Sequence, residues 1–297
     1  MELQKTICNP VSLTGVGLHT GTDTTVTFKP AAADEGITFI RTDLPDKPRL
    51  PVNVDYISLE DVVLQTSLKN GNVKIFTVEH VLAALSGLGI DNIIIELTSN
   101  EPPVGDGSAL PYVETLHKAG IRELAVPRRF IEIDDPIWML EDGVELSAIP
   151  SPDFEITFKI NYDHPAVGIR AASFRINPDI FEQKIAPART FCFLKDIEKI
   201  KNEGLIKGGS LENALVIGED DFLNKDKMRF HDEIVRHKIL DVMGDLMLLG
   251  RPLKAHIVAV RSGHAYNVRF VHKILEKLGL RCGPLTPPID IDRIKTV

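Results

Sequence analysis

One histidine and two aspartates follow one another at intervals of four residues near the end of the sequence: His237, Asp241 and Asp245. Residues four apart in an α-helix share a face, so these side chains would stand one above another. An imidazole beside a carboxylate can bind a metal ion, and these ligand types suit Zn²⁺ or Fe²⁺ better than Mg²⁺. A simple hydrogen bond between His237 and Asp241 is the alternative. However, three polar groups in an otherwise apolar helix are costly unless something satisfies them.

A third ligand and a base are available in a second segment, TVEHVLAALSG, which begins at Thr77. We expect a helix here with Thr77 as its N-cap, which places Glu79 and His80 in the first turn. His80 can ligate the metal, and Glu79 can act as general base, in the way that a glutamate serves beside a ligand histidine in the HExxH helix. The alternative is that Glu79 is a surface residue favoured by the helix dipole.

A third candidate group is His264 in the sequence RSGHAYN, directly after a predicted strand. Turns that follow strands frequently carry catalytic groups. His264 can act as a general acid if Asp245 stabilises its imidazolium form. The alternative is a histidine that caps the next helix.

The first half of the sequence predicts short strands and two helices. Residues 62–76 read as a hairpin that turns at Asn70-Gly71. The helix after Thr77 should end at Gly87 or Gly89, because glycine commonly terminates helices. The nearly all-apolar run IDNIIIEL predicts a strand covered on both faces, and PYVETLHKAG predicts a helix.

The pattern starts again after a segment around Pro127. Three strands, a mixed segment, a long helix from about Asp232, a strand and a last helix follow it. Strands followed by helices, twice over, predict an α+β protein of two domains, residues 1–126 and 127–297.

Composition excludes several classes of protein. The chain of 297 residues is 43% hydrophobic and 26% charged, with a net charge of −8 and no basic block, which argues against nucleic acid as a partner. No apolar run approaches the roughly 18–20 residues that span a bilayer, and the first residues lack a signal-peptide pattern, so we expect a cytoplasmic protein. The three scattered cysteines (Cys8, Cys192 and Cys282) argue against a disulfide framework and a thiolate zinc site.

The motifs together resemble the zinc-dependent UDP-3-O-acyl-N-acetylglucosamine deacetylases of Gram-negative bacteria, which catalyse the committed step of lipid A biosynthesis. The resemblance covers nearly the whole chain, through GVGLHTG, TVEH, ALSGLGIDN, DGSALP, ARTFCF, GLIKGGS, VRHKILDVMGDL and SGHAYN, in the family's order. It implies hydrolysis of the acetamide of UDP-3-O-[(3R)-3-hydroxyacyl]-N-acetylglucosamine, which releases acetate and the free 2-amino sugar nucleotide. It also implies Zn²⁺ as the cofactor, with Fe²⁺ as an alternative in the cell.

The resemblance implies a role for each candidate residue. The zinc ligands would be His80, His237 and Asp241, with Glu79 as general base, His264 as general acid, Asp245 as the carboxylate that orients His264, and Thr190 as a hydroxyl that polarises the substrate carbonyl. Phe191 would line the sugar and acyl region, Lys238 and Arg261 would lie near the nucleotide phosphates, and His19 lies near the site in a role left open. Relatives often have lysine in place of Arg261, and some have a cysteine where Gln65 stands.

The fold that the resemblance implies is a two-domain α+β sandwich with similar β-α-α-β layers in each domain and the active site between them. A βαβ insert near residues 185–216 would form a passage for the acyl chain. Its apolar candidates are Phe191, Phe193, Leu194, Ile197, Ile200, Leu205 and Ile206, of which we expect at least half simply to pack the insert. Some relatives are fused to a dehydratase domain, and we expect none here, because the sequence ends at Val297.

The expected partner is a small acylated UDP-sugar, handled by a monomer without stable membrane insertion. Two alternatives stay open on the residues. A zinc amidase for another N-acyl sugar nucleotide would have the same metal site. A binding protein without turnover would need four protein ligands around its metal, and an acid and a base beside a three-ligand set speak against it.

Overall fold

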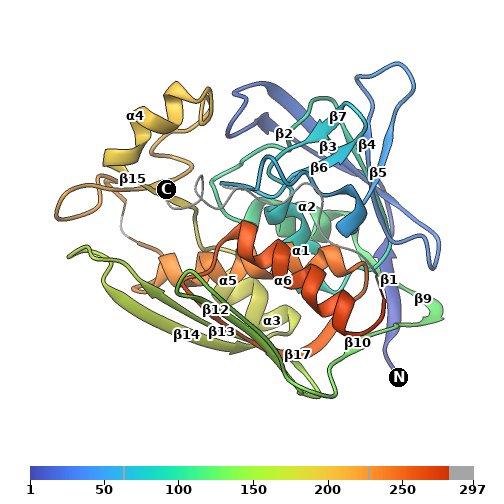
Figure 1. Ribbon diagram of the computed structural model, residues 1–297. Coiled ribbons are helices and arrows are strands. Elements are labelled where there is room, and N and C mark those ends of the chain that lie inside the picture. The colour runs from blue at the N-terminus through green and yellow to red at the C-terminus, as the bar shows by residue number, and fades with distance from the viewer. Residues whose placement is uncertain (63, 227, 281–297) are drawn as a thin grey trace.

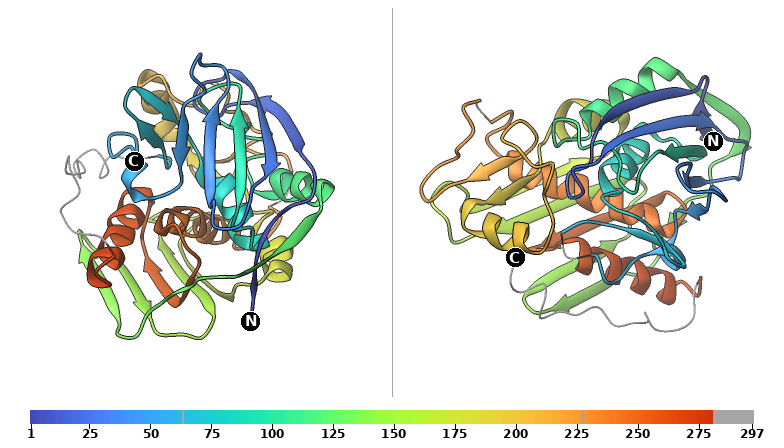
Figure 2. Two further views of the ribbon diagram at one scale, coloured as in Figure 1. Left: turned by 90° about the vertical axis from the view of Figure 1, so that its right-hand side faces the viewer. Right: turned by 90° about the horizontal axis from the view of Figure 1, so that it is seen from above.

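Two β-sheets lie on either side of a group of helices in the computed structural model, which describes residues 1–62, 64–226 and 228–280 (Figure 1; Figure 2, left). The first sheet has five strands in the order β2 (Val11–Val16), β3 (Asp23–Pro30), β8 (Ile93–Leu97), β4 (Ile37–Arg41) and β5 (Arg49–Pro51). Strands β4 and β8 are parallel, and the other neighbours are antiparallel.

The central strand β8 is buried mainly on one face. Ile93, Ile95 and Leu97 are inaccessible to solvent, whereas Ile94 and Glu96 on the other face are partly exposed. The expected strand is therefore present, but only one of its faces is fully covered. Helix α1 (Glu79–Leu88) precedes β8 in the chain and helix α2 (Leu110–Ala119) follows it. The two helices pack against each other.

The predicted hairpin is present but shorter than expected. Strands β6 (Leu68–Asn70) and β7 (Val73–Ile75) pair around a turn at Gly71 and Asn72, one residue later than predicted. Gly71 has a φ of 58°, a left-handed conformation that glycine adopts without a steric penalty. The residues described between 62 and 65 form turns, so the prediction of a strand there is wrong.

Helix α1 ends as predicted but does not begin as predicted. Gly89 terminates it in the left-handed conformation, with a φ of 69°. Its N-cap is Val78 instead of Thr77, and no side chain caps it. The Thr77 hydroxyl instead lies 2.7 Å from Oε1 of Gln65 and 2.7 Å from Oε1 of Glu101, so tertiary contacts replace the predicted cap.

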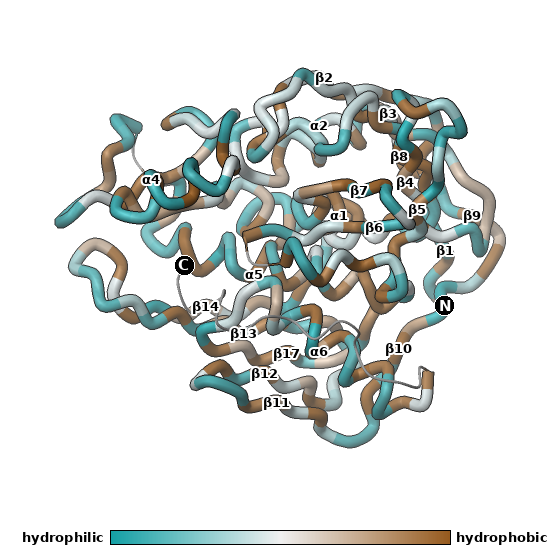
Figure 3. Tube along the Cα trace, turned by 45° about the horizontal axis from the view of Figure 1, so that its top comes forward, coloured by the Kyte–Doolittle hydropathy of each residue, from teal (hydrophilic) through white to brown (hydrophobic). Residues whose placement is uncertain are grey.

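The second sheet has the order β11 (Ile137–Glu141), β12 (Val144–Ile149), β17 (Leu253–Val260), β13 (Phe154–Asn161) and β14 (Ile169–Arg175), and β10 (Ile131–Glu132) pairs with β17. Burial alternates strictly along β17, as expected for a sheet with one face on the core and one toward solvent. Figure 3 shows hydrophobic and hydrophilic segments mixed along the strands of this sheet.

Helices α5 (Glu233–Leu246) and α6 (His264–Lys277) lie between the sheets with α1. Helix α5 packs against α1 on one side and against β13 and β14 on the other, while α6 packs against β11 and β12. The remaining elements are β1 (Leu3–Ile7), β9 (Ile121–Pro127), α3 (Pro178–Ile180), the π-helix η2 (Phe181–Ile185), and the 3₁₀-helices η1 (Val54–Tyr56) and η3 (Met247–Leu249). The mixed α+β class predicted from the sequence is confirmed.

Residues 191–217 form a small unit at the side of the molecule (Figure 1; Figure 2, right). Strand β15 (Phe191–Phe193) and strand β16 (Leu215–Ile217) are parallel, and α4 (Leu194–Asn202) connects them. This is a β-α-β connection, although Ile185 at the start of the predicted range belongs to η2.

Among the described residues, none of the helices is both long and apolar enough to cross a bilayer. Cys8 and Cys192 are free thiols, and Cys282 lies outside the described residues. The end of the predicted second domain, from residue 281, also lies outside them.

Candidate active site

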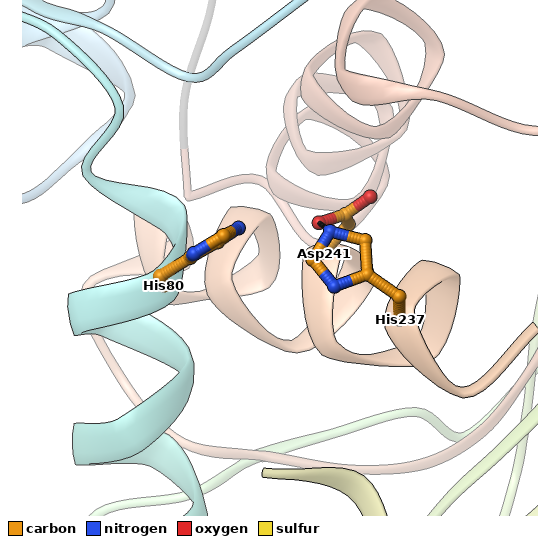
Figure 4. A group of neighbouring side chains, drawn as sticks. All are labelled: His80, His237 and Asp241. Carbon is orange, nitrogen blue, oxygen red and sulfur yellow. Dashed lines mark ion pairs between the residues drawn. The ribbon is translucent and has the colours of Figure 1, made fainter. Parts of the chain in front are cut away.

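The three predicted metal ligands meet between α1 and α5. His80 projects from α1 toward His237 and Asp241 on α5 (Figure 4). One ligand atom from each residue lies within 4.8 Å of the others, and all three side chains are buried. Residues far apart in the sequence therefore form one compact group of two imidazoles and one carboxylate.

A glycine allows the two helices to approach closely enough for this geometry. A Cβ atom on Gly244 would lie 2.2 Å from the carbonyl oxygen of Glu79. Any side chain at residue 244 would therefore push the first turn of α1 away from α5. Glu79 and His80 lie in that turn, so the close contact positions both of them relative to Asp241.

The donor atoms fit a transition-metal ion. Nδ1 of His237 lies 3.0 Å from the carbonyl oxygen of Ala188, an acceptor that fixes the proton on this nitrogen and leaves Nε2 free for a metal. Nε2 lies 3.3 Å from Oδ1 of Asp241. That oxygen is buried and has no hydrogen-bond partner among the described residues. A cation between the imidazoles and this oxygen would satisfy it.

The electrostatics hold the ligands in their metal-binding protonation states. Burial and the neighbouring His237 lower the pKa of His80 to about 3, and burial also lowers the pKa of His237. Burial alone would raise the pKa of Asp241, but Lys238 and His237 outweigh it and hold that pKa well below its usual range. Neutral imidazoles and an ionised carboxylate are the forms that bind metals.

Glu79 lies at the edge of the ligand group, almost fully buried. Its Oε2 accepts a hydrogen bond of 2.9 Å from the backbone N–H of Thr66. Burial raises the pKa of Glu79 to about 8, with Asp245 and Asp241 adding to the shift and His264 opposing it. A bound cation would oppose the shift too, since positive charge favours the carboxylate.

His264 and Asp245 form a buried pair. Nδ1 of His264 lies 2.9 Å from Oδ2 of Asp245, and Nε2 lies 3.9 Å from Oδ2 of Asp241. Burial would lower the pKa of His264, but Asp245 and Asp241 outweigh it and raise that pKa to about 9. The imidazole is therefore cationic at neutral pH in the absence of a metal, with Nε2 facing the ligand group.

A cavity of about 610 Å³ opens onto this group. Glu79, the three ligands and His264 line it, and so do four further predicted residues: Thr190, Phe191, Lys238 and Arg261. Backbone hydrogen bonds of 2.8 Å each tie Thr190 to Gly107 and Leu215. His19 does not line the cavity, although its neighbour Leu18 does.

Aromatic rings form one wall of the cavity. Phe191 makes edge-to-face contacts with Tyr162, Phe193 and His237, at centroid distances of 6.0, 6.4 and 6.4 Å. Lys238 lies at the metal end, because its Nζ donates a 2.9 Å hydrogen bond to Oδ2 of Asp241. The cavity thus combines an apolar wall with cationic groups.

Sequence reasoning missed several residues that support the site. The Thr66 hydroxyl donates to Oδ1 of Asp245, and Nδ2 of Asn267 donates to Oδ2 at 2.7 Å. Asn267 was detectable, because it lies three residues after His264 and so on the same helix face. Thr66 was not, since it is 179 residues from Asp245 in the chain.

Comparison with known proteins gives one consistent family. The family model of UDP-3-O-acyl N-acetylglycosamine deacetylase matches residues 4–276, a range that includes every candidate site residue. A UDP-3-O-acyl-N-acetylglucosamine deacetylase from Anaeromyxobacter sp. is 44% identical over 290 residues, 97% of this chain and 94% of that protein. Proteins with the same name from Myxococcus xanthus (42% identical; 92% of this chain, 86% of that protein) and Teredinibacter turnerae (40%; 93% and 91%) are also similar.

Proposed function

Because the chain belongs to the UDP-3-O-acyl N-acetylglycosamine deacetylase family, we propose that it removes the acetyl group from UDP-3-O-[(3R)-3-hydroxyacyl]-N-acetylglucosamine. The products are acetate and the free 2-amino sugar nucleotide, in the committed step of lipid A biosynthesis. One observation carries the proposal: a buried group of three ligands shares one cavity with a carboxylate, Glu79, and with His264, which is paired with a second carboxylate. Amide hydrolysis needs this combination of Lewis acid, base and acid.

His80, His237 and Asp241 would hold the metal, for which we propose Zn²⁺, with Fe²⁺ as the alternative. Three protein ligands leave one coordination position open, as in catalytic zinc sites. When bound, the ion supplies Lewis acidity that polarises the amide carbonyl and lowers the pKa of water.

The surrounding residues would move the protons. Glu79 takes a proton from the attacking water. The Thr190 hydroxyl and the His264 imidazolium stabilise the oxyanion that develops on the carbonyl oxygen. His264 then donates its Nε2 proton to the leaving nitrogen, while Asp245 holds the ring and favours its cationic form.

The cavity wall suits the rest of the substrate. We assign Lys238 and Arg261 to the phosphates and the aromatic rings near Tyr162 to the nucleotide and sugar. The acyl chain would pass along the 191–217 unit, where Phe191, Phe193 and Ile200 line the cavity. Leu194, Ile197, Leu205 and Ile206 do not line it; Leu194 is exposed, and the other three are partly buried.

The division into domains 1–126 and 127–297, with the site between two β-α-α-β layers, stays a proposal. Its support is that the five-stranded sheet uses only residues 11–97 and the second sheet only residues 131–260. The cytoplasmic location and the monomeric state also stay predictions.

Acetate release from the acylated UDP-sugar by the purified, zinc-loaded protein tests the proposed function. We expect turnover that requires the 3-O-acyl group, because the apolar lining of Phe191, Phe193 and Ile200 contributes binding only when a chain is present. UDP-N-acetylglucosamine without the chain is the matched control. Absence of turnover in a folded, loaded sample would favour another N-acyl sugar nucleotide as the substrate.

Replacing His264 by alanine should lower kcat by about 10²-fold or more and change KM much less, because proton donation acts in the transition state. The wild-type rate should fall as pH rises through the pKa of His264, about 9 without metal, since only the protonated ring is an acid. A bound metal would shift this limb to lower pH. The measurement is the pH profile of kcat. A His264→Ala variant with near-normal kcat and an unchanged basic limb would remove the assigned role.

A further inference from the structure

A buried carboxylate outside the proposed chemistry connects two segments beside the site. Glu101 is fully buried, and its oxygens accept hydrogen bonds from the backbone N–H groups of His19 (2.9 and 3.1 Å) and Thr20 (2.8 Å). The Thr20 hydroxyl adds a bond of 2.8 Å, and the Thr77 hydroxyl lies 2.7 Å from Oε1 of Glu101 and equally far from Oε1 of Gln65, so the two oxygens share its proton. Among the described residues, no lysine or arginine forms an ion pair with Glu101. Each group that contacts Glu101 is a hydrogen-bond donor, so the side chain at residue 101 must accept hydrogen bonds on both of its terminal atoms.

The loop around this carboxylate leaves no spare volume. A Cβ atom on Gly17 would lie 2.4 Å from Oε2 of Glu101 and 2.5 Å from Oγ1 of Thr20. The backbone thus wraps tightly around the carboxylate, and two N–H groups point at it. A buried charge is costly unless hydrogen bonds satisfy it, and this loop supplies them.

The other end of the contact is a strained residue. Thr77 has a φ of 54°, in the left-handed region that β-branched residues rarely adopt. Such strain persists only where the surroundings impose it, and it clusters at functional sites. Thr77 precedes Glu79 by two residues and His80 by three, so its conformation sets the direction in which the chain enters α1.

The same loop also reaches the 191–217 unit. The backbone N–H of Lys207 donates to the carbonyl oxygen of His19 (3.2 Å), and that of Gly208 donates to Leu18 (3.0 Å). Glu101 therefore contacts two segments. One is the turn at Thr77, which leads into Glu79 and His80, and the other is the loop around His19, which contacts the 191–217 unit.

We propose that Glu101 is a positioning residue, whose carboxylate holds the strained turn at Thr77 and thereby places Glu79 and His80 against α5. The expected effect on kcat rests on the proposed function, whereas the expected effect on Zn²⁺ affinity does not and is measured separately. Residues that hydrogen-bond directly to metal ligands typically change metal affinity or activity by about 10–100-fold when they are replaced. Glu101 acts one contact further out, through Thr77, so we expect an effect near the lower end of that range. Loss of the Glu101 contacts should therefore weaken the site without removing any ligand.

The first test is Glu101→Gln, which keeps the size of the side chain but turns an NH₂ group toward N–H and O–H donors. We expect the affinity of the metal-free protein for Zn²⁺, measured by chelator competition, to fall about 10-fold or more. In the zinc-loaded enzyme kcat should fall by a similar factor and KM should change little. Glu96→Gln is the matched control, since this carboxylate on β8 pairs with Lys29 near the surface and should leave all three quantities unchanged.

A second series at Thr77 decides the question if Glu101→Gln does not fold. Thr77→Val keeps the shape and removes the hydroxyl, so it should reproduce the loss of Zn²⁺ affinity, and Thr77→Ser should recover most of it. Wild-type Zn²⁺ affinity and kcat in both Glu101→Gln and Thr77→Val, with only a lower Tm, would overturn the proposal. If the wild-type enzyme fails to release acetate, the proposed function fails, but the Zn²⁺ affinities still decide the role of Glu101.

Discussion

Replacing His237 by alanine is expected to abolish acetate release, with a loss of about 10³-fold or more, because Lewis acidity contributes several kcal/mol to the transition state. The variant loses one of three ligands and leaves Asp241 buried beside Lys238. Its zinc content after dialysis should fall well below one ion per chain. Stripping the wild-type enzyme with a chelator should give the same loss, and added Zn²⁺ should restore only the wild type.

His256→Ala is the matched control for this prediction. His256 lies on β17 and faces away from the core, with Nε2 2.8 Å from the hydroxyl of Thr157. The variant should keep both its zinc and its turnover. This result would show that the loss in His237→Ala comes from removing a metal ligand and not from removing a histidine in general. Full turnover in His237→Ala, or turnover that survives complete stripping, would contradict the metal assignment.

The sequence predicts those parts of the site whose residues lie within a single helix or next to a single strand. His237 and Asp241 share a helix face, so their spacing alone indicated a pair, and the helix forms over Glu233–Leu246. The strand before His264 and the helix after it were likewise readable from local patterns. These predictions succeed because neighbouring residues determine them.

The contacts between elements could not be read from local patterns. The close approach of α1 to α5 depends on Gly244, because a Cβ atom at this residue would collide with the backbone of Glu79. The sequence does not show that the Glu79 backbone passes there. No spacing rule connects residue 80 with residue 237. The sequence offered His80 as a candidate third ligand because Glu79 and His80 stand together in the first turn of a predicted helix, and the family resemblance then implied the complete ligand set. Thr77 is instructive, because its sequence favours an N-cap while contacts with Gln65 and Glu101 give it a different role.

Replacing Glu79 by glutamine is expected to lower kcat by about 10²- to 10⁴-fold while zinc stays bound, because general base catalysis contributes that much and no ligand is removed. The amide oxygen can still accept the 2.9 Å hydrogen bond from Thr66, so the first turn of α1 should keep its place. A base works only when deprotonated, so the wild-type rate should rise with pH through the pKa of Glu79. Glutamine does not titrate, and this acidic limb should disappear.

The pH profile separates a base from a merely structural carboxylate. If Glu79 only supported His80, the glutamine variant would keep the acidic limb, with its rate reduced in proportion to lost zinc. If Glu79 is the base, the variant keeps one zinc per chain and its residual rate becomes flat toward low pH. A variant that retains most of the wild-type rate and an unchanged acidic limb would assign the base to another group. Among the residues that line the cavity, Asp196 and Asp142 are then the remaining unassigned carboxylates.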